Sequence, residues 1–294
     1  MSKNKAVEQK RECQPKRSAK QSARGNLYQK QNPEWARDRM RRIRATRGRN
    51  DGLYAQMISE RRNPIDIYSD NILVTSDWHV PFVFDEMVEL LDAVRKEHNV
   101  QDIVVAGDYW DCDNYTLFTR KTVVVTFNEE VERIAFYLKW LKRRFKRIWF
   151  CRGDHENRWM NMNGWRGDMR KLFVQTEVLN GYEVTNDDHV YIYQDDQKWL
   201  VAHPRNHRII PLSVVRDLAA IKNCNVIAGH SHHFGQGWDR SGKYRIADCG
   251  GLFDKYALDY LCETTCHPHT RNGFYLLQDN DLIPFEPLGG AGNE

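Results

Sequence analysis

The 294-residue sequence has no long apolar run, because no stretch approaches the roughly 18 consecutive apolar residues of a membrane-spanning helix. Its basic N-terminus also lacks the apolar segment of a secretory signal. The seven cysteines are odd in number and scattered, so they do not form the pattern of a disulfide framework. These absences argue against membrane insertion and secretion, and we expect reduced thiols and a cytoplasmic location.

Charge is distributed unevenly along the chain, although the formal net charge is only +4. Residues 1–65 contain 18 of the 44 basic residues and 6 of the 40 acidic ones, which leaves 26 basic and 34 acidic residues in the remainder. Arginine dominates between Arg37 and Arg49, and its planar guanidinium suits phosphate. The basic arm is either a solvated tail or a contact for a phosphate backbone, and we favour nucleic acid as its partner.

The pattern of residues predicts an N-terminal arm at 1–66, partly helical or disordered, followed by a folded domain at 67–294. Within the arm, Asn32 and Pro33 are typical of a helix start and Gly48 of its end, which predicts a helix within 32–52. Residues 61–71 have the composition of a linker. Nothing in the sequence indicates the oligomeric state.

The folded part alternates between two kinds of hydrophobic pattern. Apolar runs that end in polar residues predict strands within 72–77, 102–108 and 147–154, and helical spacing predicts helices within 85–99 and 128–145. This alternation indicates an α/β sheet with its chemistry at the carboxyl ends of the strands. In the second half of the chain the pattern predicts a hairpin at 189–203 and a helix at 211–223. It predicts further strands at 225–228, 243–251 and 272–281.

Five short polar clusters follow strand-like runs. They are Asp77-Trp78-His79, Gly107-Asp108 with Asp111, Gly153-Asp154-His155-Glu156, His203, and Gly229-His230-Ser231-His232. Each cluster alone is common in turns and loops, but five in succession at strand ends indicate a metal site. The mixture of carboxylate and imidazole donors suits Mn²⁺, Fe or Zn²⁺, with Mn²⁺ favoured. Seven donors exceed one tetrahedral site and suit two divalent ions that share a carboxylate.

These motifs, "DWH", "GDYWD", "GDHE", "AH" and "GHSH", resemble the signature of the calcineurin-like metallophosphoesterases over roughly residues 70–285. The resemblance implies an α/β fold, a four-layer αββα sandwich, which carries two metals at its strand ends and makes 67–294 a catalytic domain. It assigns one metal to Asp77, His79, Asp108 and His232. It assigns the other to Asp108, Asp154, His203 and His230, with Asp108 as the bridge.

The third motif departs from the family pattern, because Asp154 stands where the family usually has asparagine. An aspartate can still ligate a metal, so we interpret the change as tolerated; altered metal preference and reduced activity are the alternatives. The resemblance also suggests catalytic positions. His155 is expected to stabilise the transition state or to protonate the leaving oxygen. Asp111 and Glu156 are expected to orient histidines.

The predicted reaction is hydrolysis of a phosphoester, in which two metals activate a water and neutralise the phosphoryl oxygens. The sequence around the motifs is similar to bacteriophage-encoded members, and nucleases of the Mre11 and SbcD kind are the nearest functional relatives. We therefore expect cleavage of phosphodiester bonds in nucleic acid. Arg152, Arg158, Arg205 and His207 are candidates for gripping phosphate. The aromatic side chains of Trp78, Tyr109, Trp110, Trp159 and Trp165 either stack bases or belong to the core.

Two other functions are compatible with the motifs. One is a phosphomonoesterase or a small-molecule phosphodiesterase whose arm serves localisation. The other is a non-catalytic protein of nucleic-acid binding or virion assembly that retains the fold. Separately, the segment "CETTCHPH" at 262–269 has zinc-type donors at a spacing unusual for a zinc finger.

Overall fold

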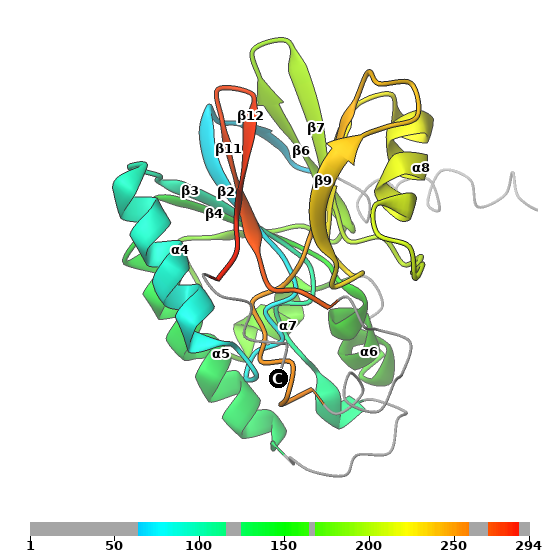
Figure 1. Cartoon of the computed structure of the whole chain (residues 1–294). Coiled ribbons are helices and arrows are strands. Elements are labelled where there is room, and N and C mark those ends of the chain that lie inside the picture. The colour runs from blue at the N-terminus through cyan, green and yellow to red at the C-terminus, as the bar shows by residue number, and fades with distance from the viewer. Residues whose placement is uncertain (1–63, 116–124, 165–167, 259–269, 288–294) are drawn as a thin grey trace, which may run out of the picture. The chain divides into compact units, whose positions relative to one another are not determined.

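The computed structural model describes residues 64–115, 125–164, 168–258 and 270–287 (Figure 1). By its internal contacts the chain divides into two units, Met1–Ile58 and Ser59–Glu294, and the described residues all belong to the second. The helix predicted at 32–52 and the cysteine and histidine segment at 262–269 lie outside the described residues. Among the helices that the structure describes, none has the length and apolar composition needed to cross a membrane.

The first of two six-stranded sheets carries three central parallel strands that were expected from the apolar runs. A fourth parallel strand lies at one edge of this sheet. At the other edge lie two strands, each antiparallel to its neighbour on the inner side. In spatial order its members are β12 (Asp281–Phe285), β11 (Phe274–Gln278), β2 (Asn71–Thr75), β3 (Asp102–Ala106), β4 (Arg147–Cys151) and β5 (Glu183–Val184). Strand β3 is buried along its whole length, as expected of a parallel strand that is covered on both faces.

The second sheet contains the predicted hairpin, whose two strands pair from His189 opposite Ala202 to Gln194 opposite Gln197. In spatial order its members are β1 (Asp66–Tyr68), β6 (His189–Gln194), β7 (Gln197–Ala202), β8 (Asn225–Ala228), β10 (Arg245–Cys249) and β9 (Phe234–Trp238). Strand β6 alternates between buried and half-buried residues, so one of its faces lies in the core.

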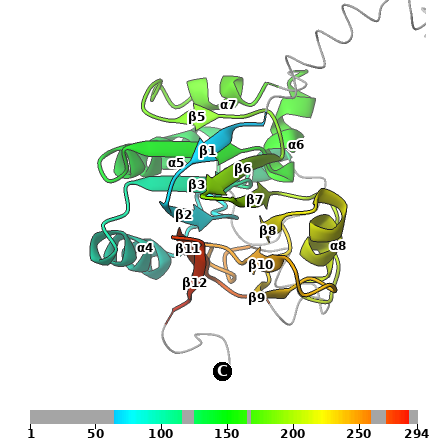
Figure 2. The same ribbon diagram turned by 90° about the horizontal axis from the view of Figure 1, so that it is seen from above.

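Helices cover the outer faces of both sheets (Figures 1 and 2). Helices α4 (Asp85–Glu97) and α5 (Phe127–Lys142) pack on the first sheet through a large apolar cluster. A second cluster fills the space between the sheets, and a third joins the second sheet to α8 (Ser213–Lys222). The order helix, sheet, sheet, helix confirms the predicted four-layer αββα sandwich.

Successive side chains of β3 point to opposite faces of the sheet, so this one strand contributes to two apolar clusters. Ile103 and Val105 of β3 face the helices, whereas Val104 and Ala106 face the other sheet. Because both faces of β3 are buried, every position along the strand has to be apolar, which accounts for the uninterrupted apolar run in the sequence.

The structure corrects two sequence-based predictions. Residues 66–68 are not part of a linker, because they form β1 and pair in parallel with β6. Their alternation is only three residues long, which is too short to distinguish from a turn. The strand predicted within 147–154 ends at Cys151, and Asp154 begins α6 (Asp154–Met162). A short helix α7 (Arg170–Val174) and a 3₁₀ turn at Asp113–Tyr115 were not predicted.

Candidate metal centre

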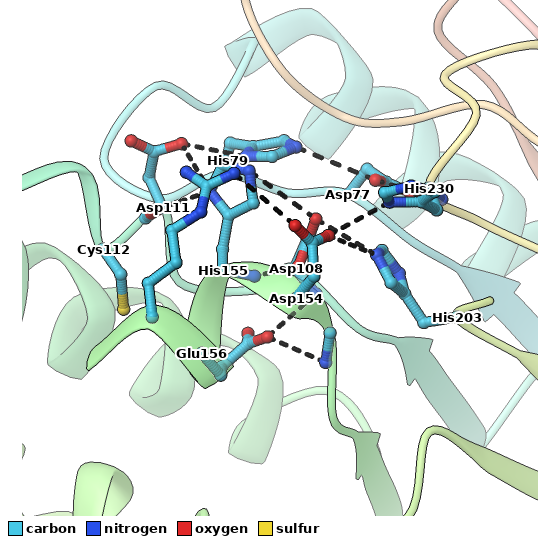
Figure 3. Close-up of polar contacts among 12 residues, drawn as sticks. Asp77, His79, Asp108, Asp111, Cys112, Asp154, His155, Glu156, His203 and His230 are labelled. Atoms are coloured by element: carbon cyan, nitrogen blue, oxygen red, sulfur yellow. Dashed lines mark hydrogen bonds and ion pairs between the residues drawn. The ribbon is translucent and has the colours of Figure 1, made fainter. Parts of the chain in front are cut away.

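The seven predicted metal donors converge in space (Figure 3). They follow five strands, β2, β3, β4, β7 and β8, that lie in two different sheets. Because parallel strands end at the same edge of a sheet, the residues that follow them meet there. The two sheets face each other, so their strand ends together bring these donors into one cluster.

One group of donors consists of Asp77, His79 and His232, all buried. The Asp77 Oδ1 lies 3.2 Å from the His232 Nε2, and the two Nε2 atoms of His79 and His232 lie 3.1 Å apart. Ligand atoms that share one ion at about 2.0–2.3 Å lie about 3 Å from one another. The separations in this group therefore suit a single bound cation.

The second group consists of Asp108, Asp154, His203 and His230. The His203 Nε2 lies 3.1 Å from the Asp108 Oδ2 and 3.3 Å from the Asp154 Oδ1, and the His230 Nδ1 lies 3.0 Å from the same Asp154 oxygen. These separations also suit a shared cation. Asp154 thus places one carboxylate oxygen among donors, whether or not the family usually has asparagine there.

Asp108 links the two groups, because its carboxylate also lies among His79 and His155 in a third donor cluster. Its Oδ2 is buried and accepts no hydrogen bond of good geometry, and the His203 Nε2 lies 3.1 Å from it. An ionised oxygen buried without a hydrogen bond costs several kcal/mol unless a cation compensates it. The chemistry of this donor set therefore fits two divalent cations.

Carboxylates and imidazoles lie close together in the centre, and they shift one another's pKa values. Burial alone would raise the pKa of Asp77 and Asp154, but hydrogen bonds with histidines outweigh burial and lower both. Burial lowers the pKa of His79, yet Asp111 and Asp77 outweigh it and raise the pKa to about 10, whereas burial holds that of His232 at about 4. Protons and metal ions therefore compete for these donors, and metal binding must release protons.

Two histidines are oriented by contacts behind them. The His79 Nδ1 lies 2.9 Å from the Asp111 Oδ1, and the His203 Nδ1 lies 2.8 Å from the Ala106 carbonyl oxygen. Each contact turns the ring so that Nε2 points into the centre. The structure thus places Asp111 where the sequence predicted an orienting group, and its functional role stays a prediction.

Glu156 makes contacts of a different kind from those predicted. Instead of contacting a histidine, its carboxylate accepts backbone N–H groups of Asp108, Trp110 and Gly153 at 3.2, 3.0 and 2.9 Å. Burial, together with the charge of Asp108, raises the pKa of Glu156 to about 7. The residue joins the loop after β3 to the start of α6, and it positions donors through the backbone.

His155 lies in the first turn of α6 and is 4% exposed. Its Nδ1 lies 2.6 Å from the Asp111 carbonyl oxygen, and its Nε2 lies 3.8 Å from the Asp108 Oδ2. Its backbone N–H donates to the Asp108 Oδ1 at 3.0 Å. The imidazole therefore borders the centre and contacts the candidate bridging carboxylate.

Backbone conformation at the centre is unusual. Asp77, His79, Asp108, His230 and His232 all have φ between 46° and 74°. Such left-handed conformations cost about 1–3 kcal/mol each and cluster at functional sites. Five of the seven donors thus sit on strained turns that aim their side chains inward.

The predicted phosphate-gripping residues lie at different distances from the centre. The Arg158 guanidinium lies 3.5 Å from the Asp154 Oδ2 and 3.4 Å from the His155 Nδ1. The His207 ring centroid lies 6.3 Å from that of His230. Arg205 is exposed and Arg152 is half-buried, and the charge of Arg205 adds to burial in lowering the pKa of Arg152.

Most of the aromatic residues near the motifs belong to the core. Trp78, Tyr109 and Trp110 are fully buried and Trp159 is 2% exposed, so of the two alternatives, base stacking and core packing, these four residues take core packing. Large rings after a strand are more often core than surface, and here they pack beneath the donor loops. Trp165 lies outside the described residues. Cys112 and Cys151 are buried free thiols.

Sequence reasoning missed one buried acid beside the centre. Asp248 in β10 is 3% exposed, and one of its oxygens accepts the Leu212 backbone N–H at 2.5 Å. Burial raises its pKa to about 6. The sequence signal for it is an aspartate inside the apolar run "RIADC".

We expect Gly229→Ala to weaken metal binding at least tenfold. The added Cβ would overlap the Ser76 Oγ and lie 2.5 Å from the Asp77 Oδ2, so Asp77 must move. Calorimetric titration of the apoprotein with Mn²⁺ measures the effect. Gly235→Ala is the matched control, because nothing lies within 4 Å of its added Cβ. Equal Mn²⁺ affinity in both variants would contradict the close packing described here.

We expect Asp248→Asn to flatten the pH dependence of stability. Because the pKa of Asp248 is near 6 in the folded state against an ordinary value of 3.8, its contribution is fully present below pH 4 and is lost as pH rises to 6. Between these values the wild type should lose up to about 3 kcal/mol more unfolding free energy than the variant. Urea titrations at pH 4 and pH 7 measure the difference, with exposed Asp66→Asn as control.

Comparison with known proteins agrees with the geometry. A family model described as calcineurin-like phosphoesterase matches residues 71–239. No curated protein sequence matches significantly. Similar solved structures include a single mutant of Vps29 from Entamoeba histolytica, at 14% identity and TM-score 0.41 over 74% of this chain and 91% of that one. They also include the nuclease MPE of Pseudomonas putida, at 15% identity and TM-score 0.33 over 73% of this chain and 87% of that one.

A conserved uncharacterized protein of Streptococcus pneumoniae, described as a predicted phosphoesterase, is 12% identical with TM-score 0.33 over 70% of this chain and 81% of that one. Likenesses this distant carry no conclusion about activity or substrate. The family model is a different matter, because it spans more than half of the chain and includes all seven donors. This chain belongs to the calcineurin-like phosphoesterase family.

Proposed function

We propose that this protein hydrolyses phosphodiester bonds, with nucleic acid as substrate, using two divalent cations of which Mn²⁺ is favoured over Fe or Zn²⁺. The observation that carries the proposal is the convergence of two donor groups on Asp108, whose buried Oδ2 accepts no hydrogen bond of good geometry. Asp77, His79, Asp108 and His232 would hold one cation. Asp108, Asp154, His203 and His230 would hold the other.

When bound, the two cations supply Lewis acidity toward the phosphoryl oxygens and lower the pKa of a coordinated water. The protein's own side chains do the remaining work. The Arg158 guanidinium lies 3.5 Å from the Asp154 Oδ2, and Arg152, Arg205 and His207 lie on loops that adjoin the donors. These residues would bind and orient the phosphate groups on either side of the scissile bond.

His155 would act as the proton donor to the leaving oxygen. Burial lowers its pKa, but the charges of Asp108 and Asp111 outweigh burial and raise it, so the ring keeps its proton more readily than a free imidazole does. Its Nδ1 is engaged by the Asp111 carbonyl oxygen, which leaves Nε2 toward the centre. A general acid needs a bound proton and an atom that can donate it toward the reacting group, and in His155 that atom is Nε2, which faces the centre.

Two features favour nucleic acid over other phosphoesters. The arm at 1–65 has 18 basic and 6 acidic residues, which suits a polyanion. The continuation of the second motif, "CDNYT", also differs from the Arg-Gly that usually follows in the protein phosphatases of this superfamily. The arm's contact with nucleic acid is part of this proposal.

A substrate panel with Mn²⁺ tests the reaction. We expect cleavage of DNA and of bis-p-nitrophenyl phosphate, and for His155→Asn a loss of about a hundredfold in kcat because the leaving oxygen is no longer protonated. Metal content of the variant should be unchanged, and His98→Asn on α4's far end serves as control. Turnover of p-nitrophenyl phosphate alone would indicate a monoesterase. DNA retention without any turnover would indicate a non-catalytic binding protein.

Deleting residues 1–50 tests the proposed arm contact. We expect weaker DNA binding and a smaller dependence of affinity on salt, because fewer phosphates are neutralised. Turnover of bis-p-nitrophenyl phosphate should be retained, since the donors all belong to the other unit of the chain. Unchanged DNA affinity in a fluorescence anisotropy titration would remove the arm from the proposal.

A further inference from the structure

The connection between β7 and α8, residues 204–211, exposes two large apolar side chains in succession. Ile209 is 62% exposed and Ile210 is 71% exposed. Burying one such side chain is worth about 1.5–3 kcal/mol, so this pair forgoes a sizeable stabilisation. Adjacent exposed aliphatic side chains are typical of a contact surface.

The 204–211 loop is firmly attached at its α8 end, so the exposure does not come from a loosely anchored segment. The Arg208 Nη1 lies 2.7 Å from the Asp217 Oδ2 on α8. The Ser213 hydroxyl donates to the Ile210 carbonyl oxygen at 2.7 Å, and the Leu212 N–H donates to the buried Asp248. These contacts hold the backbone while the isoleucine side chains point away from the core. A surface ordered before binding costs less to engage a ligand.

The loop also starts at the metal centre. It begins directly after the donor His203, and His207 within it lies 6.3 Å, ring to ring, from the donor His230. The isoleucines follow His207 by two and three positions. The loop therefore borders the centre at its start, and a substrate strand that extended along it would reach the isoleucines.

We infer that the 204–211 loop binds the unpaired bases next to the scissile phosphodiester, which makes single-stranded nucleic acid the substrate class of this site. This inference rests on the proposed function. Ile209 and Ile210 would contact base faces, and exposed Arg205 would contact a neighbouring phosphate. Only unpaired bases offer free faces, because those of a duplex are stacked on one another.

The local charges support a polyanion as the occupant. Arg152 is half-buried and close enough to Arg205 for the latter's charge to lower its pKa. A phosphate between two such cations relieves their repulsion. Along the loop, Arg205 and His207 come before Ile209 and Ile210, so candidate contacts for phosphate precede candidate contacts for bases.

The test replaces both isoleucines, Ile209→Ser and Ile210→Ser, in the full-length chain. Ile221→Ser is the matched control, since Ile221 is equally exposed at 71% but lies in the last turn of α8. Binding of a fluorescein-labelled single-stranded oligonucleotide is followed by anisotropy without added metal. Salt of about 0.3 M weakens the contribution of the basic arm and leaves apolar contacts.

We expect the double variant to bind the single strand at least tenfold more weakly and the control to bind within twofold of wild type. With Mn²⁺, the ratio of kcat/KM for the oligonucleotide to that for bis-p-nitrophenyl phosphate should fall about tenfold. Thermal unfolding should be unchanged, because the substituted side chains are exposed.

Three results would overturn the inference. One is a double variant whose affinity for the oligonucleotide and whose ratio of kcat/KM values are both the same as in wild type. Another is an equal loss for single strand and blunt duplex. The third is loss of binding to phosphatidylglycerol vesicles with oligonucleotide binding intact, which would assign the loop to a lipid surface. If wild type turns over no substrate, the proposed function fails, and the binding measurement still decides the role of the loop.

Discussion

A concentration of ionisable groups at one end of the sandwich is the constraint on which the rest of the structure depends. Asp77, Asp108 and Asp111 are at most 1% exposed, and they lie among histidines that are nearly as buried. Isolated buried charges are costly, and each carboxylate here is compensated by an imidazole or by backbone N–H groups. The buried Oδ2 of Asp108 has the His203 Nε2 at 3.1 Å but accepts no hydrogen bond, and it lies where the donor groups meet and a cation would complete the compensation.

The backbone is shaped to maintain this concentration. Left-handed turns aim Asp77, His79 and Asp108 inward, and Gly153 and Gly229 leave the space that a Cβ would take from neighbouring donors. Glu156 then fixes the loop after β3 to the start of α6 through backbone N–H groups. Strain of this kind persists only because two packed sheets determine where each strand ends.

The candidate metal donors and the candidate substrate contacts lie in different parts of the fold. The candidate metal donors lie at strand ends, whereas the connection from β7 to α8 contains Arg205, His207 and the exposed isoleucines. Strand ends are rigid and suit metal donors, which need fixed separations. Connections vary without disturbing the core, and they suit the choice of substrate.

From the sequence by itself, the apolar runs predicted an α/β sheet, and the resemblance carried by motifs such as "GHSH" predicted the αββα layers and the seven candidate donors that the structure brings together. The sequence also predicted the hairpin from 189 to 203 correctly. Only the tertiary structure decided that residues 66–68 are a strand, that Trp78 and Trp110 are core, that Glu156 binds backbone amides and that Asp248 anchors a loop. Each of these depends on a partner far away in the chain, and no local pattern records which surface a side chain will meet after folding.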